Sequence, residues 1–135
     1  MKAEEMREFS EHMRKFLKLC VHMLELDDLP HIVWITSPKI EDRTTFGTFS
    51  PRDMTIQVYL LERHPLDIMR TMAHELTHYK QQVDGNLTAI SGRTGSKQEN
   101  EANATAGIIM RKFNQLHPEC FSMKSLHEQI HFKFK

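Results

Sequence analysis

Two histidines and a glutamate stand at a spacing that suits metal chemistry, in the segment His74-Glu75-Leu76-Thr77-His78. Residues four apart on an α-helix are separated by about 40° around the helix axis, so both imidazoles project from one face and can bind one ion. Glu75 lies beside them, where its carboxylate can reach a water molecule at that ion. The segment therefore predicts two zinc ligands, His74 and His78, and a general base, Glu75.

The third ligand must come from another part of the chain, because a catalytic zinc site takes three protein ligands and leaves one position for water. Residues 96–104 carry two candidates, Glu99 and Glu101. On a helix, Glu99 shares a face with apolar residues further along, whereas Glu101 lies about 200° away and faces solvent. We therefore predict Glu99 as the third ligand, with Glu101 as the alternative if the helix has a different phase.

Two other interpretations concern the start of this helix. Asn103, one turn after Glu99 on the same inward face, is predicted to hydrogen-bond a metal-bound imidazole and so to set its tautomer. Ser96-x-x-Glu99 also matches a capping box, in which the glutamate closes the helix start rather than binding a metal. Both roles of Glu99 remain open from the sequence.

Hydrophobic periodicity and turn residues indicate the elements that must hold these side chains in place. The expected elements are a helix over 3–25, a short buried strand over 31–36, a hairpin of strands 44–49 and 54–61, a helix between Pro65 and Gly85, and a helix from Ser96 to Leu116. Gly47 predicts a bend or a close approach of the backbone. The order predicts a single α+β domain over 1–135 with a small, mostly antiparallel sheet.

The helix after Pro65 has two different sides. Its apolar stripe contains Met69, Met72, Ala73, Leu76, Tyr79 and Val83. His74 and His78 fall roughly opposite, in line with Asp67, Thr71 and Gln81. The pattern predicts a helix that buries one side in the core and presents the other to a cleft.

Composition narrows the class of protein. The 135 residues include 39% hydrophobic and 27% charged residues, which is typical of one compact soluble domain. Lys plus Arg equals Asp plus Glu at 18 each, so no nucleic-acid partner is expected; Arg111-Lys112, Lys133 and Lys135 are the basic exceptions. Residues 1–20 are too charged for a signal peptide and no segment suits a membrane, so we expect a cytoplasmic protein with Cys20 and Cys120 reduced.

The motif followed by a helix with Glu99-Asn100-Glu101-Ala102-Asn103 resembles the gluzincin branch of zinc metallopeptidases. It is similar in particular to ImmA/IrrE-like and Ste24-like peptidases and to small phage-encoded zincins. The resemblance covers about residues 54–113. It implies a minimal zincin-like fold with His74, His78 and Glu99 as ligands, Glu75 as the base and Asn103 as the partner of a ligand.

The resulting hypothesis is zinc-dependent hydrolysis of a protein or peptide substrate, with one Zn²⁺ per chain. Candidates for stabilising the oxyanion are Tyr79, His64, Arg93 and His117. Strand 54–61 is a candidate to pair with an extended substrate. The alternative is a zinc-binding regulatory or protein-interaction module without peptidase activity, although a purely structural site has no need of Glu75. The other seven histidines are expected at the surface.

Overall fold

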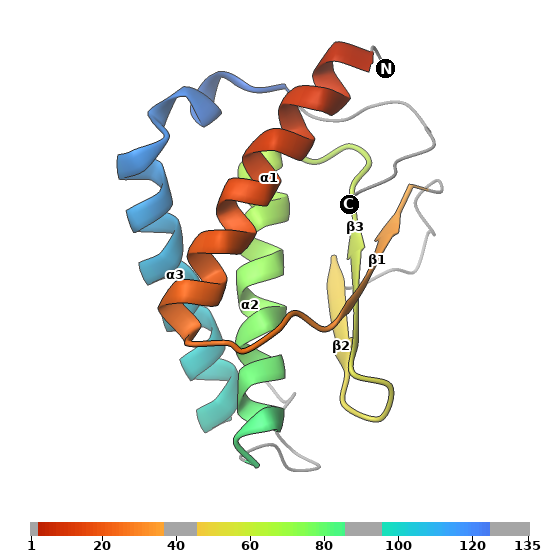
Figure 1. Cartoon of the computed structure of the whole chain (residues 1–135), viewed down its shortest axis with the longest axis vertical. Coiled ribbons are helices and arrows are strands. Elements are labelled where there is room, and N and C mark those ends of the chain that lie inside the picture. The colour runs from red at the N-terminus through yellow and green to blue at the C-terminus, as the bar shows by residue number, and fades with distance from the viewer. Residues whose placement is uncertain (1–2, 37–45, 86–95, 125–135) are drawn as a thin grey trace.

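The computed structural model describes residues 3–36, 46–85 and 96–124, and it confirms the α+β class (Figure 1). The elements are α1 (Ala3–Leu24), β1 (His31–Ile35), β2 (Gly47–Ser50), β3 (Thr55–Tyr59), α2 (Pro65–Val83), α3 (Lys97–Leu116) and a 3₁₀ turn over Pro118–Ser122. The three helices agree with the sequence to within a residue or two at each end. The interpretation of residues 86–95 as a loop lies outside the described residues.

The three strands form a mixed sheet in the order β1-β3-β2. β2 and β3 pair antiparallel, which confirms the hairpin, but β1 runs parallel to β3, so the sheet is not mostly antiparallel. β3 begins at Thr55 rather than at Met54, because Met54 has φ 51° and cannot continue an extended strand. β3 is also the central strand, and β1 and β2 pair with its two edges. The prediction that this strand pairs with an extended substrate was therefore wrong.

Helix α2 occupies the middle of the molecule, between α3 and the sheet, while α1 crosses in front of it (Figure 1). The predicted apolar stripe is buried as expected, with Met69, Met72, Ala73 and Leu76 at zero exposure. Val83 is the exception and is 55% exposed, because the stripe leaves the core at the last turn of the helix. The burial of one side of α2 fixes the direction in which its other side points.

A buried arginine that the sequence analysis did not single out joins the sheet to α2. Arg63 donates to the Tyr59 carbonyl oxygen at 2.8 Å, to the Asp67 carbonyl oxygen at 3.0 Å and to Thr71 Oγ1 at 2.6 Å. Its guanidinium also lies 4.5 Å from the centre of the Phe46 ring. These contacts connect the end of β3 to the first turns of α2.

Gly47, the first residue of β2, makes the close backbone approach that the sequence predicts. A Cβ atom on this residue would lie 2.4 Å from Thr71 Cγ2 and 3.2 Å from the Gln57 carbonyl oxygen. Thr71 cannot move aside freely, because its hydroxyl accepts from Arg63 and donates to the Asp67 carbonyl oxygen at 3.1 Å. β2 therefore packs tightly against α2 one turn before His74.

In the described part of the chain, no helix combines the length and the hydrophobicity needed to cross a membrane. Both cysteines in that part, Cys20 and Cys120, are free and buried, in agreement with the expected reduced thiols. Burial raises the pKa of both thiols, that of Cys120 to about 11, which makes them poor nucleophiles.

We expect Gly47→Ala to destabilise the fold by about 1–3 kcal/mol, because the new methyl group must displace Thr71 or separate β2 from α2. Gly107→Ala is the matched control. A Cβ at Gly107, within α3, meets nothing inside 4 Å, so this change should stabilise by about 0.5–1 kcal/mol. Urea unfolding of both variants measures the difference, and a Gly47→Ala protein as stable as wild type would contradict the tight packing.

Candidate metal centre

The two histidines lie one turn apart on α2 and are covered by α3. Their ring centroids are 4.8 Å apart and the rings are nearly perpendicular, at 83°. His74 is partly exposed, whereas His78 and Glu75 are each only 8% exposed. The polar side of α2 is therefore mostly buried against α3, rather than open along its whole length.

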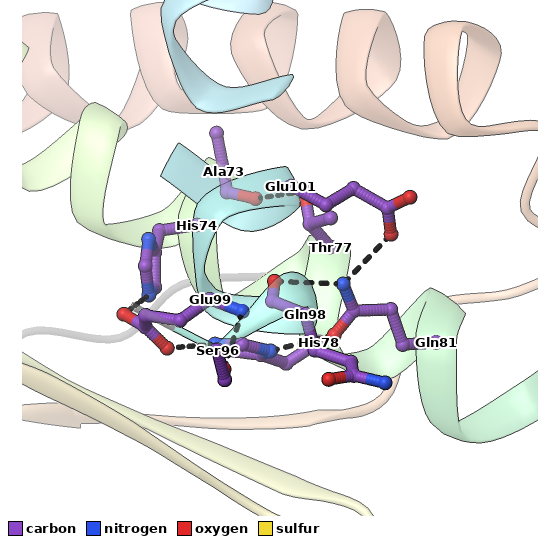
Figure 2. A network of polar contacts seen from close by, with 9 residues as sticks. All are labelled: Ala73, His74, Thr77, His78, Gln81, Ser96, Gln98, Glu99 and Glu101. Atoms are coloured by element: carbon purple, nitrogen blue, oxygen red, sulfur yellow. Dashed lines mark hydrogen bonds and ion pairs between the residues drawn. The ribbon is translucent and has the colours of Figure 1, made fainter. Parts of the chain in front are cut away.

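Glu99 contacts both histidines (Figure 2). Its Oε1 atom lies 2.9 Å from His74 Nε2, and its Oε2 atom lies 3.0 Å from His78 Nε2. The cap of α3 is made separately, by Ser96 Oγ accepting from the Glu99 amide at 3.0 Å. The capping and ligand interpretations are thus compatible, because the Ser96 hydroxyl closes the helix start while the Glu99 carboxylate faces the imidazoles.

This group can hold a metal ion. One ligand atom from each of His74, Glu75 and His78 lies within 4.8 Å of the others. The shorter contacts of Glu99 favour Glu99 as the third ligand, because its carboxylate faces both Nε2 atoms. Ligand atoms of a tetrahedral zinc site are separated by about 3.3 Å. The observed separations of 2.9 and 3.0 Å need only small side-chain shifts to reach that value.

Burial and nearby charges set the electrostatics of the site. Burial raises the pKa of Glu75 to about 7; positive charge on His78 opposes this shift and negative charge on Glu99 adds to it. Burial also lowers the pKa of His74, against the opposing effects of the Glu99 charge and of a hydrogen bond that His74 donates to the Asn103 side chain. Burying these ionisable groups costs solvation free energy. Packing alone does not require such groups, so their presence is typical of a functional site.

The two remaining site candidates from the sequence have different positions. Asn103 hydrogen-bonds to His74, although it is exposed at the rim rather than directed inward with Glu99. Glu101 is exposed as expected, and its carboxylate accepts from Gln81 Nε2 at 2.7 Å. The structure therefore brings Glu99, and not Glu101, to the histidines.

A cavity of about 280 Å³ opens at the site. It is lined by Phe46, Gly47, Arg70, Thr71, His74, Glu75 and Asn103. A larger cavity of about 690 Å³ lies along α3 and shares Arg70 with the first, but neither histidine lines it. We place the site at the smaller cavity, since His74 and the buried Glu75 both line it.

None of the described oxyanion candidates lines this cavity. The Tyr79 hydroxyl donates to Asp28 Oδ1 at 2.8 Å, and His64 Nδ1 accepts from the Leu66 amide as the cap of α2. His117 packs against the Phe113 ring at 4.8 Å. Arg93 lies outside the described residues. Arg70, which the sequence analysis did not select, is the cation at the cavity, one turn before His74.

The histidines away from the site are not all at the surface. His12 is 8% exposed, and its Nδ1 bonds to the Glu8 carbonyl oxygen at 2.9 Å, so the surface expectation was wrong for this residue. His22 and His31 are exposed, as predicted. The basic pair Arg111 and Lys112 is exposed on α3, whereas His127, His131, Lys133 and Lys135 lie outside the described residues.

No protein-family model matches the chain, and no curated protein or solved structure matches it significantly. The site must therefore be interpreted from its own geometry.

We expect Glu99→Ala to weaken Zn²⁺ binding by at least about 100-fold and Glu101→Ala to weaken it much less, because only the Glu99 carboxylate contacts both imidazoles. Competition with a chromophoric chelator measures both affinities. The opposite ranking would show that α3 presents a different residue to the metal.

Proposed function

We propose that this protein is a small zinc-dependent metallopeptidase of the zincin type. The observation that carries the proposal is the contact of one carboxylate, Glu99, with the Nε2 atoms of both motif histidines, beside the buried Glu75. This combines the local motif on α2 with a third candidate ligand from a separate helix, 21 residues beyond His78. A chance pair of histidines gives no reason for such a convergence.

Zinc fits the donors better than Mg²⁺ or Ca²⁺ does. Two imidazole nitrogens and one carboxylate oxygen are typical of catalytic zinc, whereas Mg²⁺ and Ca²⁺ prefer oxygen ligands alone. Zinc bound by three such ligands supplies a Lewis acid, which polarises a carbonyl group and lowers the pKa of a coordinated water to about 7.

Glu75 is the residue proposed to move the proton. Glu75 lines the cavity together with His74, so a substrate amide bound in this cavity would lie beside it. In peptide hydrolysis Glu75 accepts the proton of the attacking water and returns it to the leaving amine. The exposed Arg70 at the same cavity is suitably placed to stabilise negative charge that develops on the carbonyl oxygen.

The alternative function is a zinc-stabilised regulatory or interaction module. Such a module needs His74, His78 and Glu99, but it gains nothing from burying a further carboxylate at the same place. An ionisable group 8% exposed costs solvation free energy, and Glu75 adds this cost beside another carboxylate. The opening of the cavity onto Glu75 also favours the enzyme.

The first expected outcome is that the protein purifies with about one zinc ion per chain, since one set of three ligands converges. His74→Ala removes one of these ligands and should lose stoichiometric zinc, as measured by plasma emission spectrometry. His22→Ala, at an exposed position on α1, is the control and should retain zinc. Full zinc retention in His74→Ala would refute the assignment of the site.

The second outcome concerns Glu75→Gln, which keeps the side-chain size and removes the base. We expect this variant to bind zinc and stay folded but to lose activity by about 10²–10⁴-fold. The assay is digestion of denatured proteins and of a peptide library, followed by mass spectrometry. Glu11→Gln, exposed on α1, controls for the loss of one negative charge.

Products made equally by wild type and Glu75→Gln would show that Glu75 is not the base. No products from a zinc-loaded wild-type protein, across the whole library, would favour the binding module.

A further inference from the structure

Gln81 is the most deeply buried polar side chain near the site, at 2% exposure, although the sequence places it on the polar side of α2. It lies one turn after His78, between α2 and α3 (Figure 2). A buried amide is costly unless all its hydrogen-bonding groups find partners. The partners of Gln81 therefore indicate what the residue does.

The amide is bonded on both sides. Gln81 Nε2 donates to the Gln98 carbonyl oxygen at 3.0 Å and to Glu101 Oε1 at 2.7 Å. Gln81 Oε1 lies 2.8 Å from His78 Nδ1. Rotating the amide by 180° would place Oε1 against two acceptors, the Gln98 carbonyl and the Glu101 carboxylate, and the two bonds from Nε2 would be lost. The contacts on α3 thus decide which amide atom faces His78.

This orientation places a hydrogen on one nitrogen of the His78 imidazole. Because an amide oxygen only accepts hydrogen bonds, His78 Nδ1 must carry the hydrogen that Gln81 Oε1 accepts. The other ring nitrogen, Nε2, is the atom that faces Glu99 at 3.0 Å. A metal-binding histidine needs this arrangement, with one nitrogen toward the ion and the other donating to an acceptor.

We infer that Gln81 is a positioning residue, which holds His78 as the Nδ1–H form with Nε2 toward the metal, and that Glu101 acts through it. The inference rests on the proposed metal site. It gives Glu101 a role different from that of a ligand. The Glu101 carboxylate fixes the Gln81 amide, and this amide orients the His78 imidazole. His74 has its own partner in Asn103, so each histidine is oriented by a separate polar side chain.

The competing explanation is that Gln81 only ties α2 to α3. The two can be distinguished, because a simple tie affects stability but has no reason to alter the hydrogen on His78 Nδ1. We therefore choose a readout on the imidazole itself, which is available in the metal-free protein, together with the affinity for zinc.

The test compares Gln81→Leu with Gln82→Leu, which changes the neighbouring, less buried glutamine and serves as the control. We expect Gln81→Leu to lower the affinity for Zn²⁺ by about 10–100-fold, as measured by chelator competition. In ¹⁵N-labelled metal-free protein, wild type should show a hydrogen-bonded His78 Nδ1–H resonance that Gln81→Leu loses. Gln82→Leu should match wild type in both measurements.

A charge exchange provides the second variant. Gln81→Glu keeps an acceptor for His78 but sets a carboxylate against Glu101, so zinc affinity should fall. Adding Glu101→Gln restores a donor toward that carboxylate, and the double variant should recover most of the affinity.

A Gln81→Leu protein with wild-type zinc affinity and an unchanged Nδ1–H resonance would overturn the inference. A double variant no better than Gln81→Glu alone would refute the role of Glu101. If wild type binds no zinc, the proposed function fails, whereas the Nδ1–H resonance still decides the role of Gln81.

Discussion

The contact of the Glu99 carboxylate with both histidines requires α2 and α3 to lie side by side at one rotation of each helix. The core supplies that constraint. Met72 and Leu76 on α2, and Ala106 and Met110 on α3, belong to one buried cluster. The small side chain at Ala106 lets the helices approach closely, and the bulky ones prevent either helix from rotating. The position of the ligands is therefore a consequence of apolar packing: on α2 the packed residues lie on the side away from the histidines, and on α3 they continue the face that carries Glu99.

Hydrogen bonds of two buried polar side chains further fix the position of α2. Arg63 holds the first turns of α2 to the end of β3, and Gln81 holds the later turns of α2 to α3. Each makes several hydrogen bonds from a buried side chain, so removing either would leave partners unsatisfied. The histidines lie between these two fixed points, which limits the movement of the imidazoles.

Much of this arrangement was predictable from sequence because its determinants are local. Pro65 and Ser96 start α2 and α3 where expected, and the helical period places Glu99 rather than Glu101 toward the histidines. The parallel pairing of β1 with β3 was not predictable, because strand partners distant in sequence leave no periodic signal. Gln81 was missed for a related reason: its polarity suggested solvent, and only the packing of α3 shows that it is buried.

The division of roles between the helices has a consequence for folding as well as for chemistry. α2 carries both histidines and the proposed base, whereas α3 carries Glu99, the Asn103 side chain and the two acceptors of Gln81. Neither helix alone forms the site, so an ion that binds it binds only the docked pair. By linkage, such binding stabilises the docked state by the free energy of binding at the prevailing metal concentration. The contacts that orient the ligands thus couple metal binding to the packing of α3 on α2. Substitutions in the interface between these helices should therefore change the affinity for the metal as well as the stability of the fold.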